Sequence, residues 1–234
     1  MEPELIPVRS GNPASATRDT ALEQNRVLRN TYLLLGLTMV PTVIGAVVGI
    51  STGAIIMQHP IMSFFLMLGA VMGLQVGIAY YRNSSIGILL LLVMTLLLGW
   101  WLGPLLAVAL ALKNGPQLVG LAAAGTGAIF FAMAGIATTT KRDFSFMGKF
   151  LFVGMIVALL AIIANMFLQI PALALTISAV VVVVFSLYLL YHVSQIVNGG
   201  ETNYIMAATG CYLALINIFA NLLQILMALA GERD

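Results

Sequence analysis

The chain has 234 residues, of which 61% are hydrophobic and 8% are charged, and its formal net charge is +2. Soluble domains carry about 25% charged residues, so this composition excludes an ordinary water-soluble protein and predicts an integral membrane protein. The small net charge argues against a nucleic-acid-binding protein. The single cysteine, Cys211, excludes an internal disulfide and any metal site built from several cysteines.

The first segment, residues 1–24, is polar and contains three prolines. It lacks the apolar stretch of a signal peptide. It also has too few apolar side chains to offset the entropy lost when a chain becomes ordered. The sequence therefore predicts a flexible N-terminal tail over residues 1–24 and a membrane domain over residues 25–234.

Seven apolar runs follow the tail, and each is close to the ~20 residues that a membrane-spanning helix needs. They are Thr31–Ile50, Ile61–Tyr81, Ile86–Ala109, Gln117–Thr138, Phe150–Leu168, Ala172–Val197 and Ile205–Leu229. Turn-forming residues separate the runs. The third run contains Gly103-Pro104, which predicts either a kink or a split into a span and a short interfacial helix. The expected fold is an all-α bundle of seven transmembrane helices.

The basic residues indicate how this bundle is oriented. Seven spans place the two termini on opposite sides of the membrane, and a cytoplasmic N-terminus leaves only Lys113 and Arg233 on the far side. The basic residues on the cytoplasmic side would be Arg9, Arg18, Arg26, Arg29, Arg82, Lys141, Arg142 and Lys149. Because positive charge favours cytoplasmic loops, we expect the tail and the loop before Ile205 to be cytoplasmic and the C-terminus to lie on the opposite side.

Small residues recur four apart in several spans, and such spacing gives a smooth face on which helices can approach closely. The sets are Gly45 and Gly49; Gly69, Gly73 and Gly77; Gly99 and Gly103; and Ala124, Ala128 and Ala132. We expect these faces to be packed against neighbouring helices.

No catalytic or metal-binding constellation is recognisable in the spans. All acidic residues lie outside them: Glu2, Glu4, Asp19, Glu23, Asp143, Glu201, Glu232 and Asp234. An intramembrane aspartyl protease needs two buried carboxylates that share a proton, so this class is excluded. No H-E-x-x-H or G-x-S-x-G motif is present, and no lysine lies within a span to carry retinal. The sequence predicts a protein that is not an enzyme, with no catalytic residue, no metal site and no cofactor.

One ionisable residue, His192, lies within a span. One interpretation is a neutral histidine near the cytoplasmic interface that donates to a carbonyl and packs near Tyr188 or Tyr191. The other is a pH-sensing or gating group, because imidazole changes its charge near neutral pH and ionisable groups inside membranes are often functional.

The last span carries a polar stripe, Asn217, Asn221 and Gln224, at spacings of four and three residues. Gly210 and Ala214 extend this face. A polar side chain in hydrocarbon must find a partner, so the stripe predicts either hydrogen bonds between helices or the wall of a polar pathway.

Several motifs resemble the Bax inhibitor-1 superfamily and, within it, the bacterial YccA-like branch. They are "NGGETNYI" (198–205), "YLALINIF" (212–219), "VLRNTY" (27–32), "LGP" (102–104), "TTTKRDFSFMG" (138–148) and "ANMFLQIPAL" (164–173). The resemblance runs from about Val27 to the C-terminus. It implies a bacterial inner-membrane protein with six helices around a central seventh, Ile205–Leu229. The cytoplasmic loop motif comprises Gly199, Gly200, Glu201, Asn203 and Tyr204.

The resemblance implies two activities. Members of the YccA-like branch modulate FtsH, a membrane-anchored AAA protease, and their cytoplasmic tail can serve as its handle. Other members are pH-sensitive calcium leak channels, governed by paired aspartates on the sixth and seventh helices.

In this chain the two aspartate positions fall on His192 and Ala214. Calcium prefers six to eight oxygen ligands, which an imidazole and a methyl group cannot provide. We therefore expect a protease modulator, with a cation leak as the alternative; in such a leak, protonation of His192 would add positive charge. A third interpretation is a membrane protein whose polar residues only hold helices together. The expected partners are the lipid bilayer, an FtsH-like protease and, for the alternative, calcium or another cation.

Overall fold

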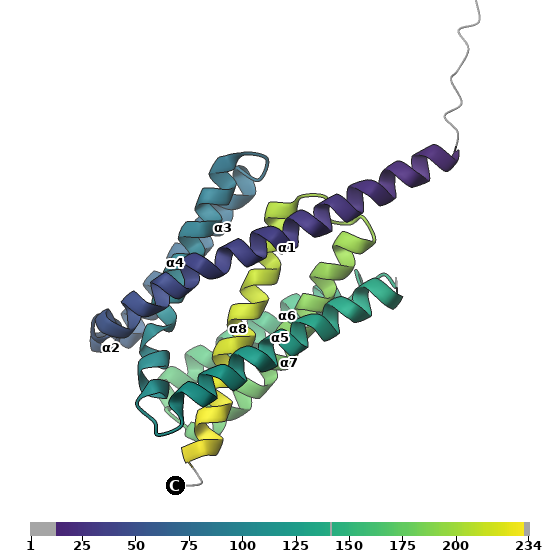
Figure 1. Ribbon diagram of the computed structural model, residues 1–234. Helices are drawn as coiled ribbons and strands as arrows, with labels where there is room; N and C mark the ends of the chain where they lie inside the picture. The colour runs from purple at the N-terminus through teal and green to yellow at the C-terminus, as the bar shows by residue number, and fades with distance from the viewer. Residues whose placement is uncertain (1–12, 141, 232–234) are drawn as a thin grey trace, which may run out of the picture.

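A computed structural model describes residues 13–140 and 142–231, with side chains from Leu22 onward. These residues form eight helices (Figure 1). They are α1 (Pro13–Thr52), α2 (Ala54–Gln58), α3 (Pro60–Tyr80), α4 (Ser85–Leu110), α5 (Gly115–Thr140), α6 (Met147–Leu168), α7 (Pro171–Val197) and α8 (Tyr204–Gly231). All except α2 are long and apolar enough to cross a membrane, which confirms the seven predicted spans.

Two element boundaries differ from a simple reading of the apolar runs. Of the expected tail, residues 1–12 lie outside the described residues, whereas residues 13–24 form the first turns of α1. These turns are rich in alanine and other helix-forming residues, and Pro13 stands at the first turn, where proline is tolerated. In addition, α4 continues through Pro104, so the alternative of a split third span is wrong. Proline interrupts only one backbone hydrogen bond, and a packed membrane helix tolerates that loss.

The main core lies around α8, which packs against α1, α3, α4, α5 and α7, while α6 packs on α7. Tyr212 of α8 is almost fully buried in this core. Its hydroxyl lies 2.9 Å from Thr42 Oγ1 of α1 and 3.3 Å from the carbonyl oxygen of Thr95 of α4. One side chain thus connects three helices by polar contacts in an apolar interior. The arrangement of six helices around a central seventh stays a prediction.

The contact between α1 and α4 is made by glycines. A Cβ atom built on Gly103 would lie 2.0 Å from the carbonyl carbon of Gly49, and one built on Gly99 would lie 2.1 Å from the carbonyl oxygen of Thr42. A Cβ atom on Gly45 would lie 2.1 Å from the carbonyl oxygen of Leu96. The two backbones therefore touch, which confirms the packing predicted for these glycines.

Two other small-residue faces do not pack as expected. Among the described residues, nothing lies within 4 Å of a Cβ atom built on Gly69 or Gly73 of α3. Ala124, Ala128 and Ala132 of α5 are exposed. Spacing by four residues defines a face of a helix, but the tertiary arrangement decides whether that face meets a neighbour. The packing predicted for Gly69, Gly73 and the three alanines is wrong within the described chain. Gly77 does meet a neighbour as predicted, because a Cβ atom built on it would lie 3.2 Å from Leu90 Cδ1 of α4.

Candidate functional site

Three loops meet at one end of the bundle. The α7–α8 loop, which carries the predicted motif, is tied to the α3–α4 loop because Asn203 Nδ2 donates to the carbonyl oxygen of Arg82 at 2.8 Å. It is tied to the α5–α6 loop because Asn198 Nδ2 donates to the carbonyl oxygen of Arg142 at 3.1 Å. We call residues 81–84, 142–146 and 198–203 together the loop surface.

The glycines of the motif reverse the chain after α7. The backbone N–H groups of Gly200 and Glu201 both donate to the carbonyl oxygen of Gln195, at 2.7 and 3.0 Å. Gly199 has a φ of 76°, a left-handed conformation that favours glycine. The chain therefore turns tightly from α7 toward α8, and the positions of Glu201 and Asn203 follow from that turn.

Asn203 begins α8 and also holds it in place. Its Oδ1 accepts from the backbone N–H groups of Ile205 and Met206, at 3.0 and 3.1 Å, which is an N-terminal helix cap. Its Nδ2 donates to Asn83 Oδ1 as well as to the carbonyl oxygen of Arg82, both at 2.8 Å. From the sequence, Asn203 is assigned only to the loop motif and this cap is not predicted, although an asparagine directly before a helix is a recognisable capping signal.

The α5–α6 loop is fixed by residues of α7 that sequence reasoning missed. Ser194 Oγ accepts from the backbone N–H of Phe144 at 3.2 Å and donates to the carbonyl oxygen of Arg142 at 3.1 Å. Gln195 Nε2 donates to Ser145 Oγ at 2.6 Å. The hydroxyl and the backbone N–H of Ser145 donate to the Asp143 carboxylate, and these bonds lower the pKa of Asp143 below its usual value. The loop surface is thus a hydrogen-bonded unit.

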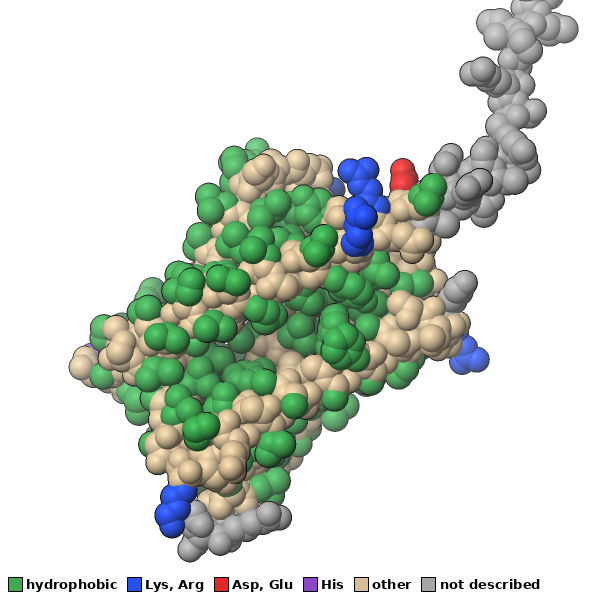
Figure 2. Space-filling view, in the orientation of Figure 1, with side chains coloured by type: hydrophobic (Ala, Val, Ile, Leu, Met, Phe, Trp, Pro, Cys, Tyr) green, Lys and Arg blue, Asp and Glu red, His purple; other side chains and the backbone are tan. Residues whose placement is uncertain are grey.

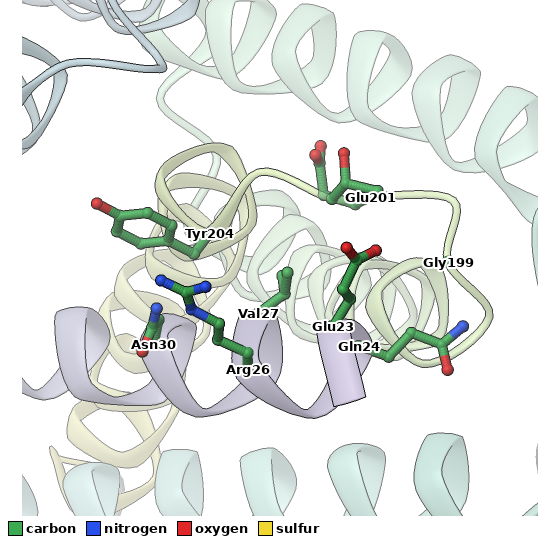
Figure 3. A pocket seen from close by; sticks show the side chains of 9 residues that line it. Glu23, Gln24, Arg26, Val27, Asn30, Gly199, Glu201 and Tyr204 are labelled. Atoms are coloured by element: carbon green, nitrogen blue, oxygen red, sulfur yellow. The ribbon is translucent and has the colours of Figure 1, made fainter. Parts of the chain in front are cut away.

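A cavity of about 420 Å³, lined mainly by polar residues, lies between α1 and the α7–α8 loop (Figure 3). Its lining comprises Glu23, Gln24, Arg26, Val27, Asn30, Gly199, Glu201, Thr202 and Tyr204. In Figure 3, Glu23 and Arg26 project from α1 toward the α7–α8 loop and Tyr204. The motif residues Gly199, Glu201 and Tyr204 therefore share this cavity with α1. No group of three or more His, Cys, Asp or Glu side chains suited to a metal occurs in residues 13–140 and 142–231.

His192 lies on α7 within an aromatic environment. Its ring centroid is 4.5 Å from that of Tyr188 and 5.5 Å from that of Tyr191, which confirms the packing predicted for it. The ring also rests on α8, because a Cβ atom built on Gly210 would lie 2.3 Å from His192 Cε1. His192 Nε2 is buried and has no hydrogen-bond partner in the described part of the chain.

The polar stripe of α8 is divided between two kinds of hydrogen bond. Asn217 Nδ2 donates to the carbonyl oxygen of Leu213, and Asn221 Nδ2 donates to that of Asn217, both at 2.8 Å and within α8. Gln224 Oε1 accepts from Ser178 Oγ of α7 at 3.0 Å. Hydrogen bonding between helices therefore applies to Gln224, whereas both asparagines donate to their own helix.

Comparison with known proteins decides the family. A family model described as "Inhibitor of apoptosis-promoting Bax1" matches residues 24–231. The "Modulator of FtsH protease YccA" of Escherichia coli is 38% identical over 213 residues, 91% of this chain and 94% of that protein. An uncharacterized membrane protein of Vibrio cholerae is 38% identical over 91% of this chain and 93% of its own length. An uncharacterized protein of Neisseria meningitidis is 38% identical over 90% of this chain and 94% of its own length.

The chain belongs to the Bax inhibitor-1 family. It is a multi-pass membrane protein, and the family match covers all seven candidate spans except the first residues of α1. The resemblance inferred from the motifs is thereby confirmed.

In this Bax inhibitor-1 protein, the two positions predicted to replace the paired acids lie on packed helices. His192 is on α7, and Ala214 is fully buried on α8, one helical turn beyond the glycine that touches the imidazole. The side chains at these positions provide one imidazole and one methyl group. The assignment of a pH-sensing or gating role to His192 and Ala214 stays a prediction.

Proposed function

We propose that this protein is a non-catalytic regulator that modulates an FtsH-like membrane-anchored AAA protease in the bacterial inner membrane. The observation that carries this proposal is the 38% identity with the E. coli modulator over nearly the full length of both chains. An inner-membrane location is supported by the name of another E. coli relative, "Inner membrane protein YccA".

The loop surface is the region that we assign to protease contact. It is built from three loops joined by side-chain hydrogen bonds, so it presents a fixed shape. Glu23, Glu201 and Arg26 all line the cavity beside it, which gives a partner both signs of charge to recognise. A preorganised surface binds with a smaller loss of entropy than flexible loops do.

Affinity purification of the full-length protein from native bacterial membranes tests this proposal. We expect an FtsH-like protease to co-purify. Reversing the charge of both acids in the cavity, Glu23→Lys with Glu201→Lys, should reduce its recovery. Lys113→Glu, at the opposite end of the bundle, is the matched control and should leave recovery unchanged. Failure of the wild-type protein to recover the protease from membranes that contain it would overturn the proposal.

The N-terminal tail is tested separately as a handle for the protease. Residues 1–12 precede α1, and an extended chain of that length reaches about 40 Å. We expect deletion of residues 1–12 to slow degradation of this protein by the protease, because the segment that the enzyme binds first is removed. If the protease requires the length of the tail and not its sequence, replacing the same residues with a Gly/Ser segment of equal length should preserve degradation. An unchanged degradation rate after deletion contradicts the handle but leaves regulation through the bundle intact.

A cation leak is the second candidate, favoured by one observation at the predicted gating residue. His192 Nε2 is buried beside Gly210 without a hydrogen-bond partner among the described residues, and such a group calls for an explanation, of which a bound water or ion is one. Calcium flux into liposomes containing the protein tests this candidate. If Asn217 and Asn221 line the pathway, replacing both with leucine should abolish flux. A calcium signal that does not depend on the protein removes the candidate.

A further inference from the structure

An apolar groove of about 600 Å³ lies between α1 and α5. Both helices pack on α7 and α8, and the groove separates them on the outer face of the bundle. Its lining comprises Leu28, Tyr32, Leu35, Gly36, Met39, Phe130, Phe131, Ala134, Gly135 and Thr138. Figure 2 shows hydrophobic side chains lining the hollow between these two helices.

The glycines of this groove face open space. Among the described residues, nothing lies within 4 Å of a Cβ atom built on Gly36 or Gly135. The rings of Tyr32 and Phe130 meet edge to face across the groove, with centroids 5.6 Å apart, and Phe131 is 74% exposed. The groove is therefore bounded by aromatic rings and kept open by residues without side chains.

The groove lies between two membrane-spanning helices and reaches the end of the molecule that carries the loop surface. Leu28 and Thr138 mark that end. Arg29 follows Leu28 on α1 and is exposed, and Arg142 lies beyond the end of α5 and is also exposed. Glu23, the acidic residue of α1 nearest to this end, lines the cavity on the α7–α8 side instead. Asp143, which is also exposed, directly follows Arg142. The mouth of the groove is thus apolar within the membrane, with Arg29 as the basic residue at its boundary.

A narrow apolar groove between two membrane-spanning helices suits an acyl chain as its occupant. The lining from Leu28 to Met39 extends about 16 Å along α1. A helix with its side chains is ~10 Å across. An acyl chain is narrower and flexible, and it enters an apolar groove without leaving backbone polar groups unpaired.

We propose that this groove binds an anionic phospholipid, with an acyl chain between α1 and α5 and the phosphate group beside Arg29. Basic residues at the membrane boundary attract anionic headgroups, and an arginine pairs with phosphate through two parallel hydrogen bonds. The proposal is independent of the protease, because it concerns the outer face of the bundle.

Native mass spectrometry of the full-length protein in detergent tests this inference, with palmitoyl-oleoyl phosphatidylglycerol and the corresponding phosphatidylcholine as probes. We expect the wild-type protein to retain the anionic lipid in preference to the zwitterionic one. Arg29→Gln should reduce that preference by about fivefold, the contribution of one basic residue near a membrane surface.

Filling the groove provides the second arm of the test. Gly36→Leu with Gly135→Leu should lower retention of both lipids by about tenfold, because the new side chains take the place of several acyl carbons. Gly69→Leu with Gly73→Leu on α3 is the matched control, since these glycines also face open space but line neither this groove nor the cavity beside the α7–α8 loop. This control should retain lipid as the wild-type protein does.

Three results would overturn the inference. The first is equal retention of both lipids by the wild-type protein, and the second is equal loss of lipid in the α3 control. The third is a wild-type dimer that the groove-filling variant converts to a monomer, which would show that a second copy of the chain occupies the groove.

Discussion

The imidazole of His192 rests directly on Gly210, and this contact leads to a prediction at the scale of one residue. A Cβ atom at position 210 would lie 2.3 Å from the ring, so Gly210→Ala must displace His192 from its place beside Tyr188. Overpacking of this kind costs about 1–3 kcal/mol. We expect a lower free energy of unfolding, measured by thermal or denaturant unfolding in detergent.

The control for this prediction removes the ring. In a His192→Ala background the steric conflict is gone, and Gly210→Ala should become neutral or slightly stabilising, because alanine favours helix over glycine by about 0.8–1.0 kcal/mol. An equal loss of stability in both backgrounds would show that the imidazole is not what requires glycine at position 210.

Asn203 gives a second prediction at the residue scale, because its two polar atoms have separate tasks. Oδ1 caps α8 and Nδ2 binds the α3–α4 loop. Asn203→Ala removes both and should lower stability by about 0.5–2 kcal/mol for the cap alone, with a further loss for the bridge. Asn203→Asp keeps the capping oxygen and removes the donor, so its stability should lie between those of alanine and wild type.

A smaller change isolates the bridge. Asn83→Ala removes one acceptor of Asn203 Nδ2 and leaves the carbonyl of Arg82 in place, so it should cost less than Asn203→Asp. Thermal unfolding in detergent measures all three variants. If Asn203→Asp were as unstable as Asn203→Ala, the cap would contribute little and the bridge would account for the whole effect.

At the scale of helices, the glycine contact between α1 and α4 should tolerate substitution poorly. A Cβ atom at Gly103 would meet backbone atoms of Gly49 and not a side chain that can rotate away. We therefore expect Gly103→Ala to lower the free energy of unfolding more than Gly210→Ala does. Gly73→Ala, which meets no described atom, is the control and should be neutral or stabilising. If Gly103→Ala and Gly73→Ala were equally stable in detergent, the close approach of the α1 and α4 backbones would be contradicted.

The same helices show how far sequence reasoning reaches. Hydrophobicity predicted all seven spans, because backbone groups in lipid must be satisfied within a helix and a bilayer fixes the length required. Spacing by four residues predicted the Gly49–Gly103 contact but also an equivalent face at Gly69 and Gly73 that has no described neighbour. The spacing of residues in the sequence shows which of them share a helix face. Only the tertiary arrangement shows which face packs against another helix.

At the candidate sites, too, the sequence predicts contacts within a helix but not contacts between distant segments. The tyrosines near His192 were predictable because they lie one and four residues away on one helix. The contact with Gly210 and the bridge from Asn203 to Arg82 join residues far apart in the sequence, so no local pattern reveals them. The sequence predicts the asparagine stripe but not its hydrogen bonds to the backbone of α8. A side-chain amide on a helix can donate either to its own backbone or to a neighbouring helix, and the sequence does not distinguish the two.

At the scale of the whole molecule, the distribution of basic residues predicts its orientation. Arg82 and Arg142 belong to the loop surface, whereas Lys113 lies between α4 and α5, where the chain crosses back from the opposite end. Single cysteines test this directly, because Cys211 is fully buried and should not react with a membrane-impermeant maleimide. Thr202→Cys and Asn114→Cys introduce exposed thiols at the two ends.

We expect Asn114→Cys to be labelled in intact spheroplasts and Thr202→Cys only after the membrane is permeabilised, because the preference of positive charge for the cytoplasmic side predicts a cytoplasmic loop surface. The wild-type protein gives the background from Cys211. The opposite labelling pattern would place the loop surface outside the cytoplasm. It would also remove the proposed contact with a cytoplasmic protease, since neither the α7–α8 loop nor the start of α1 would then face that compartment.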